Sequence, residues 1–496
     1  MAAKYLLGID IGTSSIKTAL VNVETGQPVI STFSPSNTEM PLISTKPGYA
    51  EQDPEQWWNE LVNSMALLRK QFSFKAEEIA AIGIAYQMHG LVCLDKNLKS
   101  LRNSIIWCDS RAVEIGNKAF HELGENFCLS NFLNSPGNFT ASKLKWVKDN
   151  EPSIFEKVHK VLLPGDYIAM KLTGDPVTTI SGLSEGIMWN FSRSAVATEL
   201  LDNYGISKSV VSDVVDTFSE QGKLSSSAAE ILGLKAGTPV SYRGGDQPNN
   251  AFSLNVLQPG EIAATAGTSG VVYGITDTVE YDPASRVNTF VHVNSTKEKP
   301  RYGVLLCING TGILNSWLRK TVFNGASYND INAKAREVNI GAEGLLIYPF
   351  GNGAERVLEN KNPGSMFRGL QFNTHHSGHI ARAAQEGIVY SLYYGVTIMK
   401  QIGMQVNKVR AGHANMFLSD VFADAFANTL GATLELYDTD GATGAARGAG
   451  VGAGIYNNFG ECFAGMKKIK TIEPDKEKQK QYAEFYNNWQ EQLNKL

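Results

Sequence analysis

Two short glycine turns, each after an apolar stretch, are the first residues in the chain whose types and spacing could do chemistry. One runs from Gly12 to Ser15 and the other from Gly267 to Gly270. A phosphate chain binds where several backbone N–H groups point at it, and glycine lets the backbone come close. Threonine and serine hydroxyls add donors. Either turn alone is more typical of an ordinary hairpin, but the pair together predicts a site for a triphosphate.

Two acidic residues lie beside these glycine-rich segments. Asp10 ends an apolar stretch just before the first turn, and Asp246 follows Gly244 and Gly245. A carboxylate in apolar surroundings costs stability unless it meets a cation or donors, and beside a phosphate it suits Mg²⁺. Phosphoryl transfer to a hydroxyl needs a carboxylate that orients the nucleophile and accepts its proton. Asp10 and Asp246 are therefore the candidate metal ligands, and Asp246 is the candidate base. The alternatives are an Asp10 side chain that bonds the following turn and a plain Gly-Gly-Asp turn.

A third candidate group is Gln87-Met88-His89, which follows a predicted strand. Gln and His side chains can both donate to and accept from sugar hydroxyls, and Met88 offers an apolar face. We treat the other seven histidines as structural.

These groups depend on strands and helices that the hydrophobic pattern predicts. Residues 5–10 and 16–23 alternate as two strands of a hairpin, and residues 80–85 and 261–266 are buried strands. Asp53 and Pro54 are a typical helix start. Further helices are expected after residues 410–414, with Phe417, Leu418, Val421, Phe422 and Phe426 on one face, across the Ala- and Gly-rich residues 441–454, and around Tyr482, Phe485, Tyr486 and Trp489. We expect the last helix to pack on the body of the protein.

The alternation of strands and helices predicts an α/β fold with two related halves. The glycine turn after a strand occurs twice, about half the chain apart, which favours a duplicated design of two lobes. We expect an N-terminal lobe over residues 1–243, a C-terminal lobe over residues 244–455, and a helical extension over residues 456–496.

Composition excludes several function classes. The chain has 496 residues, 45 basic against 49 acidic, and no long basic run, so neither nucleic acid nor a membrane is an expected partner. No apolar run reaches the roughly 18 residues of a membrane helix. Its five cysteines contain no Cys-x-x-Cys, which fits a reducing cytoplasm. The P-loop, dinucleotide and zinc-site motifs are absent from the sequence.

Together these segments resemble the FGGY carbohydrate kinases, from about Leu6 to about Gly454. The matching segments are residues 8–14, 47–58, 87–90, 106–111, 143–147, 163–167, 244–246 and 267–270. Their order and spacing carry the resemblance. The segment Gln87–Gly90 is most similar to the members that phosphorylate xylulose.

The resemblance implies two actin-like, ribonuclease-H-like lobes with the active site in the cleft between them. It also implies transfer of the γ-phosphoryl group of ATP, with Mg²⁺, to the 5-hydroxyl of D-xylulose, and, by analogy, a homodimer. By position, the base is Asp246, and the sugar-binding residues are Gln87, Met88, His89, Asp246 and Gln247. The residues for the nucleotide and its phosphates are Asp10, Gly12, Thr13, Ser14, Lys17, Gly267, Thr268, Ser269, Gly310, Gly412, His413 and Asn415.

Two departures from the family pattern keep alternatives open. Gln247 stands where the xylulose-phosphorylating members commonly have Asn and the related glycerol kinases have Gln. Ala411-Gly412-His413 replaces the usual run of three glycines in the adenosine-binding loop, so the nucleotide preference can differ. The substrate can thus be another ketose or polyol, such as ribulose, fuculose or glycerol. Non-catalytic actin-like proteins share the architecture, and ATP hydrolysis without any sugar would favour that class.

Overall fold

The computed structural model describes residues 4–359 and 361–495, which form two compact units. The first unit combines the chain up to Asn255 with Phe290–Arg301 and Thr439–Met466. The second contains Val256–Thr289, Tyr302–Asp438 and the chain from Lys467 onward. The chain therefore passes repeatedly from one unit to the other.

A five-stranded sheet forms the centre of the first unit, with the strand order β13-β5-β1-β2-β3. Its strands are β1 (Tyr5–Ile11), β2 (Ile16–Asn22), β3 (Pro28–Ser34), β5 (Ile79–Tyr86) and β13 (Val240–Gly245). β1, β5 and β13 run parallel, β2 is antiparallel to β1, and β3 is antiparallel to β2. The hairpin β1–β2 confirms the predicted strand-turn-strand, and β5 confirms the predicted strand at 80–85.

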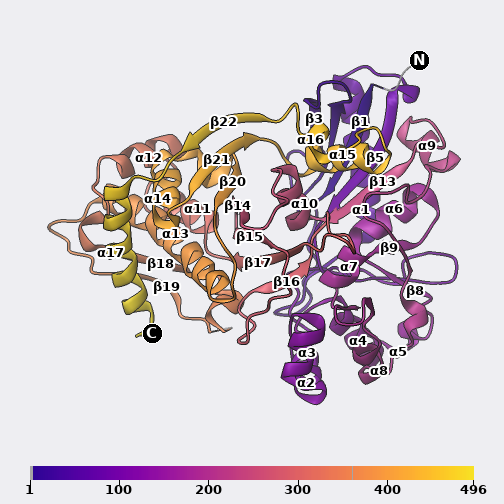
Figure 1. Cartoon of the computed structure of the whole chain (residues 1–496), viewed down its shortest axis with the longest axis horizontal. Coiled ribbons are helices and arrows are strands. Elements are labelled where there is room, and N and C mark those ends of the chain that lie inside the picture. Colours follow the sequence, from indigo (N-terminus) through magenta and orange to yellow (C-terminus); the bar gives the residue numbers. More distant parts are fainter. Residues whose placement is uncertain (1–3, 360, 496) are drawn as a thin grey trace. The chain divides into compact units, whose positions relative to one another are not determined.

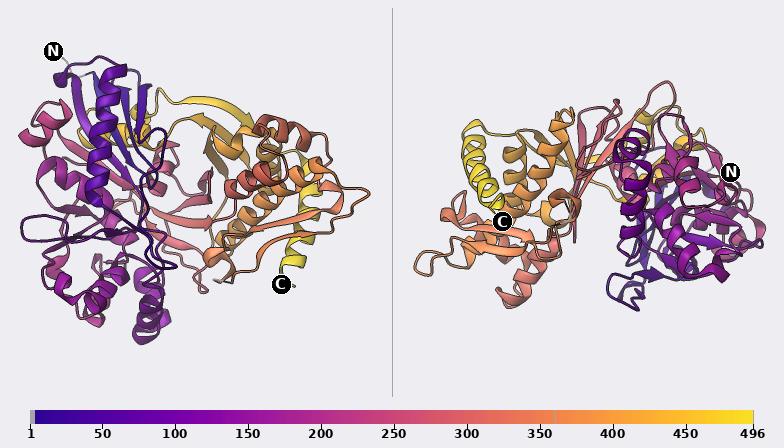
Figure 2. Two further views of the ribbon diagram at one scale, coloured as in Figure 1. Left: turned by 180° about the vertical axis from the view of Figure 1, so that it is seen from behind. Right: turned by 90° about the horizontal axis from the view of Figure 1, so that it is seen from below.

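Helices cover both faces of this sheet. α1 (Pro54–Gln71) begins where the sequence predicted, because Asp53 caps it by accepting from the Glu55 N–H at 3.0 Å. α1 packs against β2 and β3, and α15 (Gly441–Gly452) packs against β1, β5 and β13. α15 lies in front of the sheet in Figure 1 and α1 lies in front of it in the reverse view of Figure 2.

The remaining elements of the first unit are short and surround this core. They are β4 (Glu51–Gln52), β6 (Val92–Leu94), β7 (Ser104–Ile105), β8 (Lys160–Leu162), β9 (Val177–Thr179), β10 (Trp189–Asn190), β11 (Ala195–Val196), β12 (Asp213–Val215), α2 (Val113–Leu123), α3 (Glu125–Phe132), α4 (Thr140–Asn150), α5 (Pro152–Phe155), α6 (Pro164–Thr173), α7 (Ile180–Glu185), α8 (Thr198–Asn203), α9 (Ser226–Leu232), α10 (Asp246–Ser253) and α16 (Phe459–Cys462).

The second unit repeats the strand plan of the first. Its sheet has the order β16-β17-β15-β14-β20-β21-β22. In it β14, β20 and β21 run parallel, β15 is antiparallel to β14, and β17 is antiparallel to β15. Five consecutive positions of this sheet, β17-β15-β14-β20-β21, match β3-β2-β1-β5-β13 in order and direction. This repeated order supports the predicted duplication and the actin-like α/β fold.

The helices of the second unit pack on this sheet and on one another, and β18 pairs with β19 beside it. The strands are β14 (Glu261–Ala266), β15 (Gly270–Thr276), β16 (Asn288–Val291), β17 (Tyr302–Ile308), β18 (Leu346–Phe350), β19 (Gly364–Arg368), β20 (Lys408–Gly412), β21 (Thr433–Asp438) and β22 (Lys467–Ile472). The helices are α11 (Gly312–Thr321), α12 (Tyr328–Arg336), α13 (Ser377–Gln401), α14 (Asp420–Leu430) and α17 (Lys476–Leu493).

The units differ from the boundaries expected from the sequence. α15 was assigned to the lobe over residues 244–455, but its Ala and Gly surface packs on the first sheet. A methyl group on Gly8 or Gly83 would collide with its main-chain carbonyls at Ala442 and Ala445. The extension over residues 456–496 is not wholly helical, because β22 pairs antiparallel with β21. Its terminal helix α17 packs on α13 and α14, as expected.

The helix expected after residues 410–414 begins later than predicted. Ser419 caps α14, whose first residue is Asp420. Phe417 is buried, but Leu418 is 57% exposed and lies in a preceding turn of 3-10 helix, off the buried face. α14 begins later than predicted because the chain leaves the helical conformation at Ser419, a break that the apolar spacing did not reveal.

Candidate functional site

The candidate residues of the first unit meet at one end of its parallel strands. Asp10 lies near the end of β1, Gln87-Met88-His89 follows β5, and Asp246 follows β13 as the first residue of α10. Asp10 is in register with Ala85, which is in register with Gly244. The carboxyl ends of parallel strands share one edge of the sheet, so the topology gathers these three groups.

Asp10 and Asp246 form an electrostatically coupled pair. Burial and, after it, the charge of Asp10 raise the pKa of Asp246 to about 7, against hydrogen bonds from Gln247. Burial also raises the pKa of Asp10 to about 6, with Asp440 adding to the effect and Lys17 opposing it. Both residues are partly exposed. A carboxyl that titrates near neutral pH is suited to accept a proton.

Lys17 sits opposite Asp10 in the β1–β2 hairpin. Its ammonium group donates to Asp440 at 3.1 Å, and Asp440 caps α15 by accepting from the Thr443 N–H at 2.8 Å. Burial works against it, yet Asp440 and Asp10 raise the pKa of Lys17. Lys17 thus places a permanent positive charge beside Asp10 and Asp440, close to the first glycine turn.

Hydrogen bonds to neighbouring residues hold the first glycine turn in place. The Gly12 N–H donates to the Ser15 carbonyl at 3.1 Å, and the exposed Ser14 accepts from Met40 N–H at 2.8 Å through its carbonyl. Thr13 Oγ1 lies 3.3 Å from Gln87 Oε1, to which it donates. Its oxygen also accepts from Trp107 Nε1 at 2.9 Å.

Gln87 is placed differently from the sugar contact that the sequence predicted. It is only 2% exposed, and its amide is engaged at both ends, accepting from Thr13 and donating to Gln52 at 3.0 Å. Gln52 in turn donates to the Thr13 carbonyl at 2.7 Å. Gln87 therefore links the first turn to the end of β5 through hydrogen bonds made in the interior of the protein.

Met88 and His89 lie between the ends of β5 and β13. Met88 is buried against Gly245, where an added methyl group would come within 2.6 Å of Met88 Cγ. His89 has a positive φ of 60°, and its ring packs on Phe139 and Phe290 at centroid distances of 4.9 and 5.5 Å. Gln247 lies beside the base, and its buried Oε1 makes no hydrogen bond in the described structure.

Three residues to which the sequence gave no role also belong to this site. Trp107 is 38% exposed and anchored to Thr13. Lys143 donates to the carbonyls of His89 at 2.8 Å and Ile106 at 3.0 Å, and burial lowers its pKa to about 7. Glu185 is buried, and burial raises its pKa well above the ordinary value. Trp107 and Lys143 lie in segments that carry the family resemblance, which was the available signal, whereas Glu185 lies in none.

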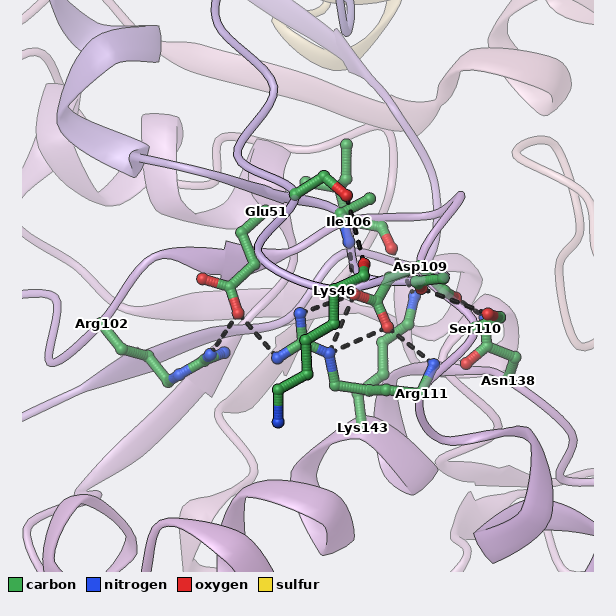
Figure 3. Close-up of polar contacts among 12 residues, drawn as sticks. Lys46, Glu51, Arg102, Ile106, Asp109, Ser110, Arg111, Asn138 and Lys143 are labelled. Atoms are coloured by element: carbon green, nitrogen blue, oxygen red, sulfur yellow. Dashed lines mark hydrogen bonds and ion pairs between the residues drawn. The ribbon is translucent and has the colours of Figure 1, made fainter.

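A buried ionic network supports Lys143 and the loop at Trp107 (Figure 3). Asp109 accepts from the Ala50 N–H at 2.6 Å and pairs with Arg111 at 2.7 Å. Glu51 pairs with Arg111 at 2.7 Å and with Arg102 at 2.6 Å. Buried charges are tolerated when they are paired and hydrogen-bonded in this way, so the network fixes this wall of the site.

The second glycine turn is joined to the start of α11 in the second unit. The Gly267 carbonyl accepts from the Gly312 N–H at 2.8 Å, and the Thr268 carbonyl accepts from the Ile313 N–H at 3.2 Å. Thr311 Oγ1 donates to both carbonyls, at 3.3 and 3.2 Å. Ser269 completes the turn into β15, and Gly310 packs so tightly on Pro349 that a side chain there would clash.

The other candidate nucleotide residues lie beside this turn. β20, which ends at Gly412, is the parallel neighbour of β14, which ends just before Gly267. His413 donates its N–H to the Tyr437 carbonyl at 2.8 Å. Asn415 has a positive φ of 54°, and its side-chain nitrogen lies 3.6 Å from where a methyl on Gly267 would stand. The second unit thus gathers all its predicted nucleotide residues at one edge of its sheet.

Two other kinds of site are absent from the described residues. In residues 4–359 and 361–495, no group of three or more His, Cys, Asp or Glu side chains is arranged to hold a metal ion. Over the same residues, no helix has the length and apolar character to cross a membrane.

Comparison with known proteins gives a consistent result. The model of the FGGY carbohydrate kinase N-terminal domain matches residues 5–253, and that of the C-terminal domain matches residues 262–453. A xylulose kinase of Bacillus subtilis is 30% identical over 406 residues, which cover 82% of this chain and 79% of the relative.

Solved structures share the same fold. The crystal structure of a xylulose kinase from Rhodospirillum rubrum superposes with a TM-score of 0.87 at 25% identity, covering 99% of both chains. A gluconate kinase from Lactobacillus acidophilus gives a TM-score of 0.89 at 24% identity, over 99% of this chain and 98% of its own, and shows the fold alone. The chain belongs to the FGGY family of carbohydrate kinases.

Proposed function

We propose that this enzyme phosphorylates D-xylulose at its 5-hydroxyl, with ATP as the donor, to give D-xylulose 5-phosphate and ADP. The observation that carries the proposal is the convergence of Asp10, His89 and Asp246 at the ends of β1, β5 and β13. Relatives that bear the name xylulose kinase support this choice of sugar.

In the proposed reaction, Asp246 orients the sugar hydroxyl and accepts its proton as the γ-phosphoryl group arrives. His89 and Met88 hold the sugar, with a polar and an apolar contact respectively. The first glycine turn and Lys17 are the phosphate-binding groups of the first unit, and the turn at Gly267 is that of the second. Donors fixed in advance stabilise the charge that develops during transfer without needing to reorganise.

Mg²⁺ fits the residues of the first unit. Burial raises the pKa values of Asp10 and Asp246, and each carboxyl lies close to another carboxylate, a setting that a divalent cation relieves. Mg²⁺ commonly takes one or two carboxylates together with waters and substrate phosphates, so a larger cluster is not needed. When bound, it would neutralise charge on the phosphates.

A sugar panel tests the proposal. We expect ADP release with ATP and Mg²⁺ to be fastest with D-xylulose, compared with D- and L-ribulose, L-fuculose, glycerol, gluconate and no sugar. Asp246→Asn should lower kcat by about 10² to 10⁴ because the base is lost. Faster turnover of another sugar would refute the substrate. Gln247, which stands where the resemblance associates Asn with xylulose, makes a different ketose or polyol the second candidate.

A further inference from the structure

Glu185 is a fully enclosed acid at the end of α7, and the reaction proposed above does not use it. It is 1% exposed and makes no ion pair in the described part of the chain. Glutamate is almost never this buried unless something compensates it. Its contacts must therefore compensate for its burial. They connect Glu185 to the ends of β5 and β13, where the proposed sugar site lies.

Towards β5, Glu185 holds His89 at two points. Its carboxyl oxygen Oε1 accepts from the His89 N–H at 3.3 Å, and its main-chain carbonyl lies 2.8 Å from His89 Nδ1. Since a carbonyl oxygen only accepts, Nδ1 must carry the proton, and Nε2 of the neutral ring is then an acceptor. His89 also has a positive φ, a conformation that is uncommon outside glycine and that persists where the surroundings enforce it.

Towards β13, Glu185 lies directly against the residue before the base. A methyl group on Gly245 would collide with Glu185 Oε2. Glu185 is thus wedged between His89 and the strand that ends at Asp246. It fixes the spacing of the two residues that the sugar must reach together.

α7 itself is anchored, so that Glu185 cannot move away. Thr179 caps the helix by accepting from the Gly182 N–H at 3.0 Å. Ser184 accepts from the Val291 N–H at 2.9 Å, and Ser181 donates to the Val291 carbonyl at 3.1 Å. The neighbouring Phe290 closes the same contact by packing on His89.

We propose that Glu185 is a positioning residue for the sugar, which holds His89 in its left-handed backbone conformation so that Nε2 accepts a hydrogen bond from a sugar hydroxyl beside Asp246. This inference rests on the proposed function. Glu185 takes no part in proton transfer, because Oε1 is engaged by His89 and Oε2 is enclosed. Its effect is on sugar binding, through His89.

Kinetics of Glu185→Ala and Glu185→Gln test the role. Glu185→Ala should raise the KM for D-xylulose about tenfold or more, the loss of one charge-assisted or buried hydrogen bond, while the KM for ATP stays within about twofold. Glu185→Gln keeps an oxygen that accepts from the His89 N–H, so its KM should stay within about threefold of the wild type. Glu78→Ala, which removes a distant acid paired with Lys4, is the matched control and should change neither KM.

Equal KM values in Glu185→Ala and the wild type would overturn the proposal. So would a parallel rise in both KM values, or a Glu185→Gln variant as impaired as Glu185→Ala, because either result indicates a general structural defect.

Crystal structures of the wild type and both variants without sugar give a second readout that needs no activity. His89 should leave its positive φ in Glu185→Ala and keep it in Glu185→Gln. If His89 stays in place in Glu185→Ala, the positioning role is wrong. If the wild type does not phosphorylate D-xylulose but His89 moves as expected, the proposed substrate fails while the positioning role stands.

Discussion

Asp246 determines the pH dependence that we expect for the reaction. Burial and the neighbouring Asp10 raise the pKa of this carboxyl from 3.8 to about 7. A protonated carboxyl cannot accept the sugar proton, so kcat/KM should fall about tenfold per pH unit below about pH 7 and level off above it. Steady-state rates with D-xylulose between about pH 5.5 and 9 measure this limb.

Asp10→Asn tests the cause of the acid limb. The substitution removes the charge that raises the pKa of Asp246, so the limb should move to lower pH even though the overall rate falls. Asp440→Asn is the matched control, because the charge of Asp440 acts on Asp10 and Lys17. An unchanged limb in Asp10→Asn would contradict the coupling of the two carboxyls.

Stability has the opposite dependence on pH at this residue. The folded state holds the proton of Asp246 more tightly than the unfolded chain does. The stability that this group contributes is therefore complete below pH 3.8 and is lost as the pH rises through about 7. Asp246→Asn should accordingly not lower the Tm at about pH 8. This measurement separates loss of the base from loss of the fold.

At the scale of elements, the close packing of α15 on the first sheet makes Gly83 sensitive. In Gly83→Ala, the new methyl group would collide with the Ala445 carbonyl in α15, and overpacking of this kind costs about 1–3 kcal/mol. Hydrogen exchange should rise in peptides of β1, β5 and α15. Peptides of the second sheet should not change.

The matched control for this prediction is Gly351→Ala. The nearest atom to its new methyl group is Ser365 Cβ at 3.3 Å, a side chain that can shift. Faster exchange spread evenly over both sheets in Gly83→Ala would show that the helix is not held at this contact.

Local signals in the sequence were sufficient for the elements that carry the first turn and the base. The alternation before and after Gly12 predicts β1 and β2, and Asp53-Pro54 predicts the start of α1, because each depends on neighbouring residues. The packing of α15 on the first sheet was not predicted, because packing between distant segments is not encoded in a local pattern. Glu185 was missed for the same reason, since its partner His89 lies 96 residues away.

The candidate site was likewise predicted only in part. Residue types at strand ends, and then the family resemblance, identified Asp10, His89 and Asp246, and their convergence follows from the parallel order of β1, β5 and β13. Gln87 was predicted as a sugar contact from its type alone, but its amide bonds Thr13 and Gln52 in the interior. The type of a side chain shows which hydrogen bonds it can make. Only the folded structure shows which of them are already made within the protein.

At the scale of the whole molecule, duplication separates the proposed sugar residues from most of the proposed nucleotide residues. The first unit holds His89, Glu185 and Asp246, and the second holds Gly267 and Gly412. Bound ligands reduce local opening, so each should slow hydrogen exchange where it binds. D-xylulose should protect residues 86–90, 184–186 and 245–248 of the first unit.

ATP with Mg²⁺ should protect residues 267–270, 310–313 and 412–415 of the second unit. It should also protect residues 10–14 of the first unit, because the first turn is proposed to hold phosphates beside Asp10. Removal of Mg²⁺ with a chelator should reduce the protection of residues 10–14 more than the protection of the second unit, since Asp10 would then face the phosphates without a cation. Exchange measured by mass spectrometry with ATP alone, Mg²⁺–ATP and D-xylulose separates these cases. Protection of residues 10–14 that is indifferent to Mg²⁺ would remove Asp10 as a metal ligand and leave Lys17 as the charge that holds the phosphates there.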